Sequence, residues 1–166
     1  MDPGIQIQAF KPHQVGRIVA IERASFARDA WDRELLLEYF RNAPELFLIA
    51  KSSGRIAGYI LTVTTPRLRT AELVSIAVDP RVRRTGTATA LIDATRSKLR
   101  ARRIATWWLM VGIENEPAIH LYNRHGFRRV RRVKNYYGAG RDAWRMRLSI
   151  SGTTRTGSRP QKKEQK

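Results

Sequence analysis

An apolar segment that stops at a proline and continues into a helical pattern most constrains the fold of this 166-residue chain. Residues 73–78 (Leu-Val-Ser-Ile-Ala-Val) are typical of a buried strand, because β-branched residues are bounded by turn residues. Asp79 and Pro80 end the strand, since proline has no N–H to donate. From Thr85 onward, side chains recur at the spacing of a helix face, at Ala88, Leu91, Ile92, Thr95 and Leu99. The segment therefore predicts a strand, a tight loop and a helix.

The loop from Arg83 to Ala88 has the composition of an anion-binding site. A helix N-terminus offers free N–H groups and the positive end of the helix dipole. Gly86 allows the backbone to approach a phosphate closely, and Arg83 and Arg84 add positive charge. The loop has neither the Gly-Lys-Ser/Thr of a Walker loop nor the repeated glycines of a dinucleotide fingerprint. An ordinary strand–helix turn with solvated arginines is the alternative.

A second segment, Asn115 to Phe127, reads as a short helix after an apolar and aromatic strand at residues 105–111. Asn115 can cap this helix, Pro117 suits its first turn, and Gly126 suits the position just after its end. Taken alone, this segment leaves open that Asn115 is only a cap and Tyr122 only a core aromatic.

The remaining segments complete a mixed order of strands and helices. We expect helices from Val15 to Phe26, from Asp32 or Arg33, from Thr85, and after Asn115. We expect strands at residues 5–10, 46–50, 56–63, 71–78, 105–111, 127–136 and 143–150.

The charge balance is strongly basic, with 32 Lys and Arg against 14 Asp and Glu and a net charge of +18. Basic residues concentrate in the tail 151–166, in residues 124–134 and in residues 96–103. A solvated face explains any single arginine, but the whole excess favours contact with RNA, a ribosomal surface or an acidic protein. We expect one domain over residues 1–150 and a disordered basic tail over residues 151–166.

The residue types also exclude several kinds of site. The chain has no cysteine, so it can form neither a disulfide nor a cysteine zinc site, and its three scattered histidines argue against a metal. No apolar run is long enough to span a bilayer, and the first residues lack a secretory pattern. We expect a cytoplasmic protein without membrane contact.

Together the two motifs resemble the acetyl-CoA site of the GCN5-related N-acetyltransferase (GNAT) superfamily. Arg83, Gly86 and Ala88 match its Arg-x-x-Gly-x-Ala pyrophosphate loop, and the resemblance covers nearly all of residues 5–150. It implies an α/β fold with a mixed central sheet of about seven strands flanked by about four helices. It also implies acetyl-CoA as cosubstrate without a metal, held by Ile76, Ala77, Val78, Arg83, Arg84, Thr85, Gly86, Thr87, Ala88, Asn115 and Tyr122.

The family resemblance gives two of these residues particular roles. It places Asn115 on the pantetheine arm of the coenzyme and Tyr122 beside its sulfur, where a hydroxyl can protonate the leaving thiolate. Backbone N–H groups at the end of the strand 73–78 can then hold the thioester oxygen.

Within the superfamily, the chain is most similar to the bacterial ribosomal-protein-alanine N-acetyltransferases. Four segments carry this similarity: residues 21–26, residues 75–80, the pair Tyr136 and Tyr137, and residues 141–146. The similarity implies a protein or peptide N-terminus as acceptor, contacted by Phe26, Trp31, Tyr136 and Tyr137. The alternative for the two tyrosines is that they only pack or cap the final hairpin.

One position departs from the family pattern. Met110 stands where the family usually has a glutamate that acts as general base, and methionine cannot accept a proton. Either activity is lost or another base serves, and Glu72 is the candidate, because Glu-dependent histone lysine acetyltransferases place their base in a similar Ala-Glu-Ile-Val pattern. The alternative is that Glu72 is a solvated carboxylate. Glu114 and Glu116 fit better as partners of the following helix dipole.

Three functions therefore remain open from the sequence. The first is acetylation of a protein amine, at an N-terminus or at a lysine. The second is acetylation of a small amine, although the basic surface does not favour polyamines. The third is a ribosome- or RNA-associated module that binds acetyl-CoA without turnover, which the loss of a base at Met110 supports.

Overall fold

The computed structural model describes residues 4–150, so the predicted basic tail lies outside the described residues. The helices are α1 (Val15–Phe26), α2 (Arg33–Asn42), α3 (Thr87–Ala101) and α4 (Glu116–Arg124). The strands are β1 (Gln6–Ala9), β2 (Phe47–Ser52), β3 (Arg55–Thr65), β4 (Thr70–Val78), β5 (Thr106–Gly112), β6 (Arg128–Val133) and β7 (Ala143–Ser149). Within the described part of the chain, this confirms the predicted seven-strand α/β fold with four flanking helices.

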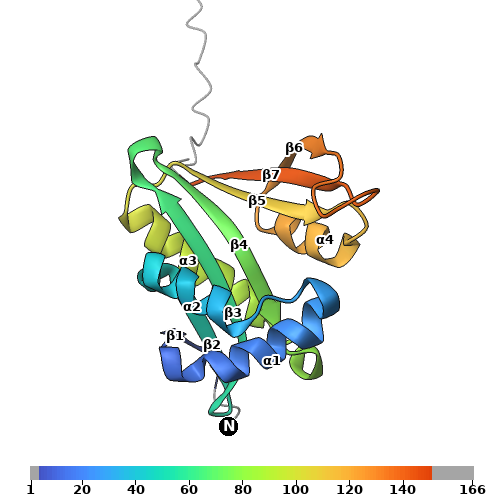
Figure 1. The fold of residues 1–166 in the computed structure, drawn as a ribbon. Helices are drawn as coiled ribbons and strands as arrows, with labels where there is room; N and C mark the ends of the chain where they lie inside the picture. The colour runs from blue at the N-terminus through green and yellow to red at the C-terminus, as the bar shows by residue number, and fades with distance from the viewer. Residues whose placement is uncertain (1–3, 151–166) are drawn as a thin grey trace, which may run out of the picture.

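All seven strands form one sheet in the order β1-β2-β3-β4-β5-β7-β6 (Figure 1). β4 and β5 pair in parallel, and the other neighbours pair antiparallel. A parallel pair needs a crossover connection, which α3 supplies.

Two hydrophobic cores lie on the two faces of this sheet. One core packs α3 and α4 against the sheet through Leu91, Leu99, Ile119 and the central Trp107. The other packs α1 and α2 through Ile18, Ile21, Leu36 and the fully buried Tyr59. The alternation of side chains along β4 supplies residues to both cores, as expected for a strand covered on both faces.

Local contacts fix the position of the segment that connects β4 with α3. Asp79 follows β4, is almost fully buried, and pairs with Arg17 of α1 and Arg81. These hydrogen bonds and charges hold the pKa of Asp79 well below its usual range. Across the sheet, Gly58 lets α3 approach β3, because an added Cβ would lie 2.7 Å from the carbonyl oxygen of Ala77 and 3.2 Å from the Thr87 side chain. The N-terminus of α3 is therefore anchored close to the end of β4.

The sheet opens in its middle. Pairing of β4 with β5 ends at Leu73 and Leu109, although both strands continue further. The register between β3 and β4 shifts at the same level, because Leu61 pairs with Ser75 while Thr62 pairs with Leu73. Val74 is thus the extra residue of a β-bulge, which bends β4 away from β5.

The predicted strand over residues 127–136 is shorter in the structure. β6 ends at Val133, and the chain then turns with Asn135 at φ +54°. The Asp142 carboxylate accepts a hydrogen bond from the Asn135 backbone N–H at 2.9 Å. This turn takes Tyr136 and Tyr137 out of the strand and into the β6–β7 loop.

Candidate active site

A large cavity of about 1490 Å³ lies where β4 and β5 diverge. One end is lined by the loop before α3 and by the start of α4. The other end is lined by the C-terminal part of α1, the following segment to Trp31, and the β6–β7 loop. The two ends are here called the coenzyme end and the acceptor end, after the roles that the sequence predicts for them.

The coenzyme end is built mainly from backbone. Arg83, Arg84, Gly86, Thr87 and Ala88 all line the cavity, whereas Thr85 does not. Arg84 and Gly86 have positive φ values of 63° and 82°, so the chain is tightly curved before the first turn of α3. Thr85 instead closes the loop, since its hydroxyl donates to the Val82 carbonyl oxygen at 2.7 Å. The free N–H groups of the helix start and the two arginines make this end suitable for phosphate.

The wall of the cavity is the unpaired edge of β4. Residues 73–78 line the cavity, including the predicted Ile76, Ala77 and Val78. β3 occupies one side of this stretch of β4, whereas the side toward β5 is not paired beyond Leu73. Backbone groups on that side can therefore hydrogen bond to a bound molecule, as an edge strand does.

α4 brings Asn115 and Tyr122 to the opposite wall. The Asn115 side-chain oxygen accepts from the Ala118 backbone N–H at 3.3 Å, so its capping role is observed and a contact with pantetheine would use its amide nitrogen. Tyr122 is 6% exposed and packs edge-on against Phe127. Burial raises the pKa of the Tyr122 hydroxyl, so this group stays protonated at neutral pH.

The acceptor end collects three of the four aromatic residues that the sequence predicts. Phe26, Trp31 and Tyr137 line the cavity, and Trp31 stacks on Tyr39 with ring centroids 4.9 Å apart. The Tyr137 hydroxyl donates to the Met110 carbonyl oxygen at 3.2 Å, and burial raises the pKa of Tyr137 to about 12. Tyr136 is 51% exposed and does not line the cavity.

Met110 and Glu72 lie on the same side of the sheet, but in different settings. Met110 lines the cavity. Glu72 precedes the point of divergence, pairs in register with Trp108, and does not line the cavity. Burial raises the pKa of Glu72. Arg145 opposes this rise, because its Nη1 atom lies 3.5 Å from Oε1 of Glu72. The role of Glu72 as proton acceptor stays a prediction.

The structure adds two residues that the sequence did not single out for the site, Glu22 and Ser75. Both are buried and both line the cavity. The signal for Glu22 was available, because it is a charged residue on the apolar face of α1 beside Ile18 and Ile21. A carboxylate at a buried helix position is uncommon unless it has a partner or a function.

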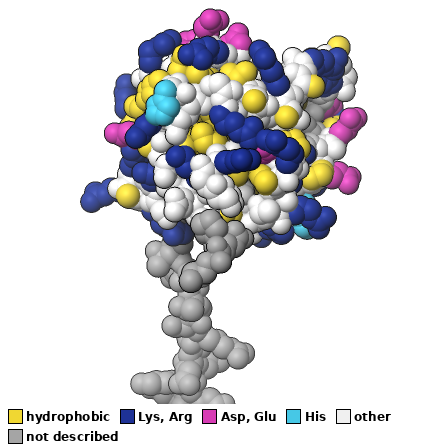
Figure 2. Space-filling model, turned by 90° about the horizontal axis from the view of Figure 1, so that it is seen from below, with side chains coloured by type: hydrophobic (Ala, Val, Ile, Leu, Met, Phe, Trp, Pro, Cys, Tyr) yellow, Lys and Arg dark blue, Asp and Glu magenta, His cyan; other side chains and the backbone are white. Residues whose placement is uncertain are grey.

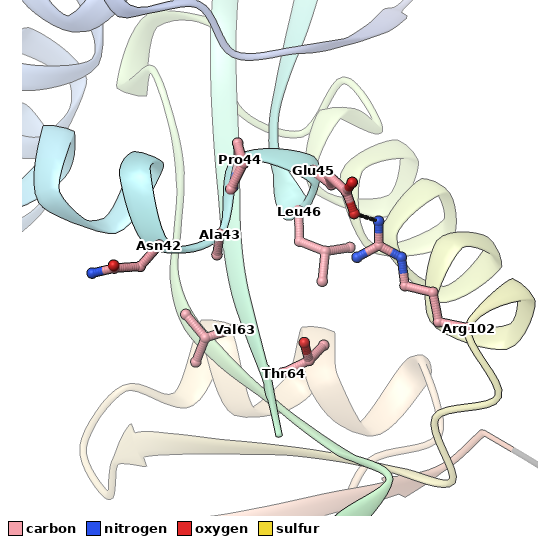
Figure 3. A pocket seen from close by; sticks show the side chains of 8 residues that line it. All are labelled: Asn42, Ala43, Pro44, Glu45, Leu46, Val63, Thr64 and Arg102. Atoms are coloured by element: carbon pink, nitrogen blue, oxygen red, sulfur yellow. Dashed lines mark hydrogen bonds and ion pairs between the residues drawn. The ribbon is translucent and has the colours of Figure 1, made fainter. Parts of the chain in front are cut away.

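A smaller hollow of about 420 Å³ lies at the end of α2, between the 3₁₀ turn Pro44–Leu46 and the end of α3 (Figure 3). An ion pair between Glu45 and Arg102 closes one side of it. It contains none of the predicted site residues. Among residues 4–150, no group of His, Asp and Glu side chains is arranged to hold a metal, and no helix is long and apolar enough to cross a bilayer.

The surface reflects the charge of the sequence. Figure 2 shows Lys and Arg side chains spread over the face that it presents. β6 contributes four exposed arginines, of which Arg132 pairs with Asp142 at 2.7 Å and Arg129 lies over the Trp144 ring. Charges on an edge strand also discourage pairing with other chains.

Comparison with known proteins agrees with this geometry. The sequence is 29% identical over 147 residues to an N-alpha-acetyltransferase of Sulfurisphaera tokodaii, covering 80% of this chain and 85% of the relative. It is 39% identical over 102 residues to the [ribosomal protein bS18]-alanine N-acetyltransferase of Escherichia coli, covering 60% of this chain and 68% of the relative.

Solved structures and sequence profiles give the same result. The fold matches Ard1 from Thermoplasma volcanium with a TM-score of 0.83 at 29% identity, covering 87% of this chain and 97% of the other. The profile of the acetyltransferase (GNAT) family matches residues 16–127, a segment that contains β4, the loop before α3, and Tyr122. The chain therefore belongs to the acetyltransferase (GNAT) family.

Proposed function

We propose that this protein transfers the acetyl group of acetyl-CoA to the N-terminal α-amine of another protein. The observation that carries the proposal is one continuous cavity that joins the anion-binding start of α3 to a buried Tyr122 and then to an aromatic acceptor end. A diphosphate, a thioester and an incoming amine can occupy these three parts in that order.

The coenzyme would lie along the unpaired edge of β4. Its diphosphate would accept hydrogen bonds from N–H groups near Gly86 and Thr87, with Arg83 and Arg84 beside it. Its pantetheine amides would pair with β4, and a backbone N–H near Val74 would hold the thioester oxygen as negative charge develops on it. Tyr122 would donate its proton to the departing sulfur.

The absence of a carboxylate at Met110 favours an α-amine over a lysine as acceptor. An α-amine has a pKa of about 7.7–8.0, whereas a lysine amine has a pKa of about 10.4. Near neutral pH, an appreciable fraction of the α-amine is already uncharged, so it needs less help to lose a proton. The names of the relatives, N-alpha-acetyltransferase and [ribosomal protein bS18]-alanine N-acetyltransferase, also support an N-terminal acceptor.

The test is thiol release from acetyl-CoA with a panel of amines. A peptide with a free N-terminal alanine should react faster than the same peptide blocked at its N-terminus and carrying an internal lysine, and faster than spermidine. A preference for the blocked peptide would indicate a lysine acetyltransferase, and a preference for spermidine a small-amine enzyme.

Met110 supports a second candidate, a module that binds acetyl-CoA without turnover. Calorimetric binding of acetyl-CoA without thiol release from any amine would identify that function. A ribosomal or other acidic partner can be tested in parallel, because attraction to a basic protein weakens as salt screens it.

A further inference from the structure

Glu22 is an unusual group at the acceptor end of the cavity. It lies in the last two turns of α1, is 1% exposed, and lines the cavity with Ser75 and Met110. Its Oε2 atom is enclosed and has no hydrogen-bond partner among the residues that the structure describes. Such burial costs free energy, since a carboxylate loses its hydration without full compensation. A purely structural role would be served better by an apolar residue.

A pair of hydroxyl groups connects Glu22 with the wall of β4. The Tyr59 hydroxyl and Ser75 Oγ lie 2.8 Å apart, and both residues are buried. Ser75 directly follows the bulge at Val74, where the thioester carbonyl is placed by the proposed function. The Tyr59 hydroxyl is also close enough to Glu22 to lower the pKa of its carboxyl group, which burial raises. A path of hydroxyl groups therefore runs from the cavity wall to the buried carboxyl group.

Four other carboxylates near the site already have cationic partners, whereas Glu114 lines the cavity as an exposed, hydrated group. Glu72 faces Arg145 at 3.5 Å, and Asp142 faces Arg132 at 2.7 Å. Asp29 pairs with Arg141, and Asp79 pairs with Arg17 and Arg81. A nearby cation favours the ionised form of a carboxyl group and makes it a weaker base.

The surroundings of Glu22 suit a base that works near neutral pH. Burial raises the pKa of the Glu22 carboxyl to about 7, against opposing hydrogen bonds from the Tyr59 hydroxyl and the Trp31 backbone N–H. A general base is most effective when its pKa lies near the working pH. Three titratable groups on the elements packed against α1 are buried or half-buried: Tyr59 on β3, Glu72 on β4 and Tyr39 on α2. The other titratable and charged groups on these elements are exposed: His13, Arg28, Asp29, Arg33, Glu34, Glu38, Arg41, Arg55 and Arg81.

We propose that Glu22 is the terminal proton acceptor for the incoming amine, reached through the hydroxyl groups of Ser75 and Tyr59. This inference rests on the proposed function and replaces Glu72 in the role that the sequence predicted for it. It explains how the site can work with methionine at position 110 and why a carboxyl group lies buried on α1.

The proton balance is complete with groups that the site holds. The α-ammonium gives one proton to Ser75 as Ser75 passes its proton to Tyr59 and Tyr59 passes its proton to Glu22. The amine nitrogen then forms the C–N bond, and the C–S bond breaks with its electron pair on sulfur. Tyr122 donates its proton to the sulfur, and its oxygen then accepts the second proton that leaves the nitrogen. Glu22 finally releases its proton to solvent, so the net products are the amide, the free thiol of CoA and one proton.

The experiment compares kcat against pH for the wild type and Glu22→Gln with a peptide bearing a free N-terminal alanine. Because the peptide is the same, the ionisation of its amine cancels in the ratio of the two kcat values. The ratio of wild-type to variant kcat should reach roughly 10²-fold, the usual scale for a lost general base, and should rise through about pH 7 as Glu22 ionises. Glu22→Asp should recover part of the rate, while acetyl-CoA affinity measured by calorimetry stays the same.

Two further variants complete the test. Glu72→Gln should give a ratio that does not change with pH, and Tyr59→Phe should lower kcat by interrupting the path. A ratio for Glu22→Gln that is flat with pH would overturn the proposal, as would a pH-dependent ratio for Glu72→Gln or an unchanged rate for Tyr59→Phe.

Failure of the proposed function looks different from failure of this inference alone. If wild-type protein binds acetyl-CoA but releases no thiol with any amine, the acetyl transfer itself is absent and Glu22 has no proton to accept. If wild-type protein acetylates the peptide and Glu22→Gln keeps the wild-type pH profile, only the assignment of Glu22 is wrong. Gln is nearly isosteric with the neutral acid, and thermal melting of both Glu22 variants checks that they fold.

Discussion

The two ends of the cavity are built in different ways. The coenzyme end is built mainly from one continuous stretch of chain, in which β4 runs through a tight loop into α3 and presents mainly backbone groups, and the start of α4 lies beside it. The acceptor end gathers side chains from α1, β5 and the β6–β7 loop, which lie far apart in the sequence. A backbone-built site should tolerate the loss of a side chain and be destroyed by added bulk. A site built from side chains should respond to the loss of single functional groups.

The largest effect should come from bulk at the coenzyme end. Gly86→Glu should abolish the rise in melting temperature that acetyl-CoA produces, because it puts a negative side chain beside the expected diphosphate and strains a residue with φ +82°. Gly54→Glu is the matched control, since Gly54 also has a positive φ, lies in open space, and is outside the cavity. Normal acetyl-CoA binding by Gly86→Glu would contradict the assignment of this end.

A second large effect should appear in stability at the acceptor end. Because the folded state holds the pKa of Glu22 at about 7, it binds one more proton than the unfolded state between about pH 4.3 and 7. The stabilisation is complete below that window and is lost progressively as pH rises from about 4.3 to about 7, by about 4 kcal/mol. Glu22→Gln should remove this pH dependence, so the difference between the unfolding free energies of the two proteins should change between about pH 4.3 and 7 in urea titrations and stay constant at higher pH. Parallel curves would show that Glu22 has an ordinary pKa.

Removing one hydroxyl group between the two ends should separate binding from chemistry. Tyr122→Phe keeps the packing of the ring against Phe127 and removes the proton donor. Turnover should fall by roughly 10²-fold, while the acetyl-CoA dissociation constant changes little. Equal turnover, measured by thiol release, would reduce Tyr122 to a core aromatic.

The smallest effect should distinguish the two neighbouring tyrosines. Tyr137→Phe loses the hydrogen bond to the Met110 carbonyl oxygen and should raise the acceptor KM by about two- to tenfold, as expected for one hydrogen bond. Tyr136→Phe should have a smaller effect, because that ring does not line the cavity. The opposite order in steady-state kinetics would place the peptide on the outer side of the β6–β7 loop.

Much of the fold was predictable because its signals are local. The alternation of apolar residues, the Asp-Pro strand end and the Asn and Gly helix boundaries predicted the observed order of elements. The main difference was the strand expected to reach residue 136, which ends at Val133. At its end the Asn135 backbone N–H donates to the Asp142 carboxylate, a contact that joins the two ends of the β6–β7 loop.

The candidate site also has parts that the sequence predicts and parts that it does not. The sequence predicted the loop at residues 83–88 and Tyr122 as parts of the site, because a strand–helix turn and a short capped helix place their own groups, and all of these residues except Thr85 line the cavity. The position of Glu72 relative to the cavity was not predictable, because it depends on where β4 stops pairing with β5. The sequence alone placed both strands at the opening but did not say at which residue they diverge.

By itself, the sequence determined which segments become strands and helices, where an anion can meet a helix start, and that position 110 has no base. These follow from hydrophobic periodicity, turn chemistry and residue type, which act over a few neighbours. Only the tertiary structure decided that Val74 forms a bulge, that β4 and β5 separate beyond Leu73, and that Glu22 meets Tyr59 beside Ser75. Those features depend on strand register and on the packing of α1 over the sheet, and both are set by contacts between residues distant in the chain.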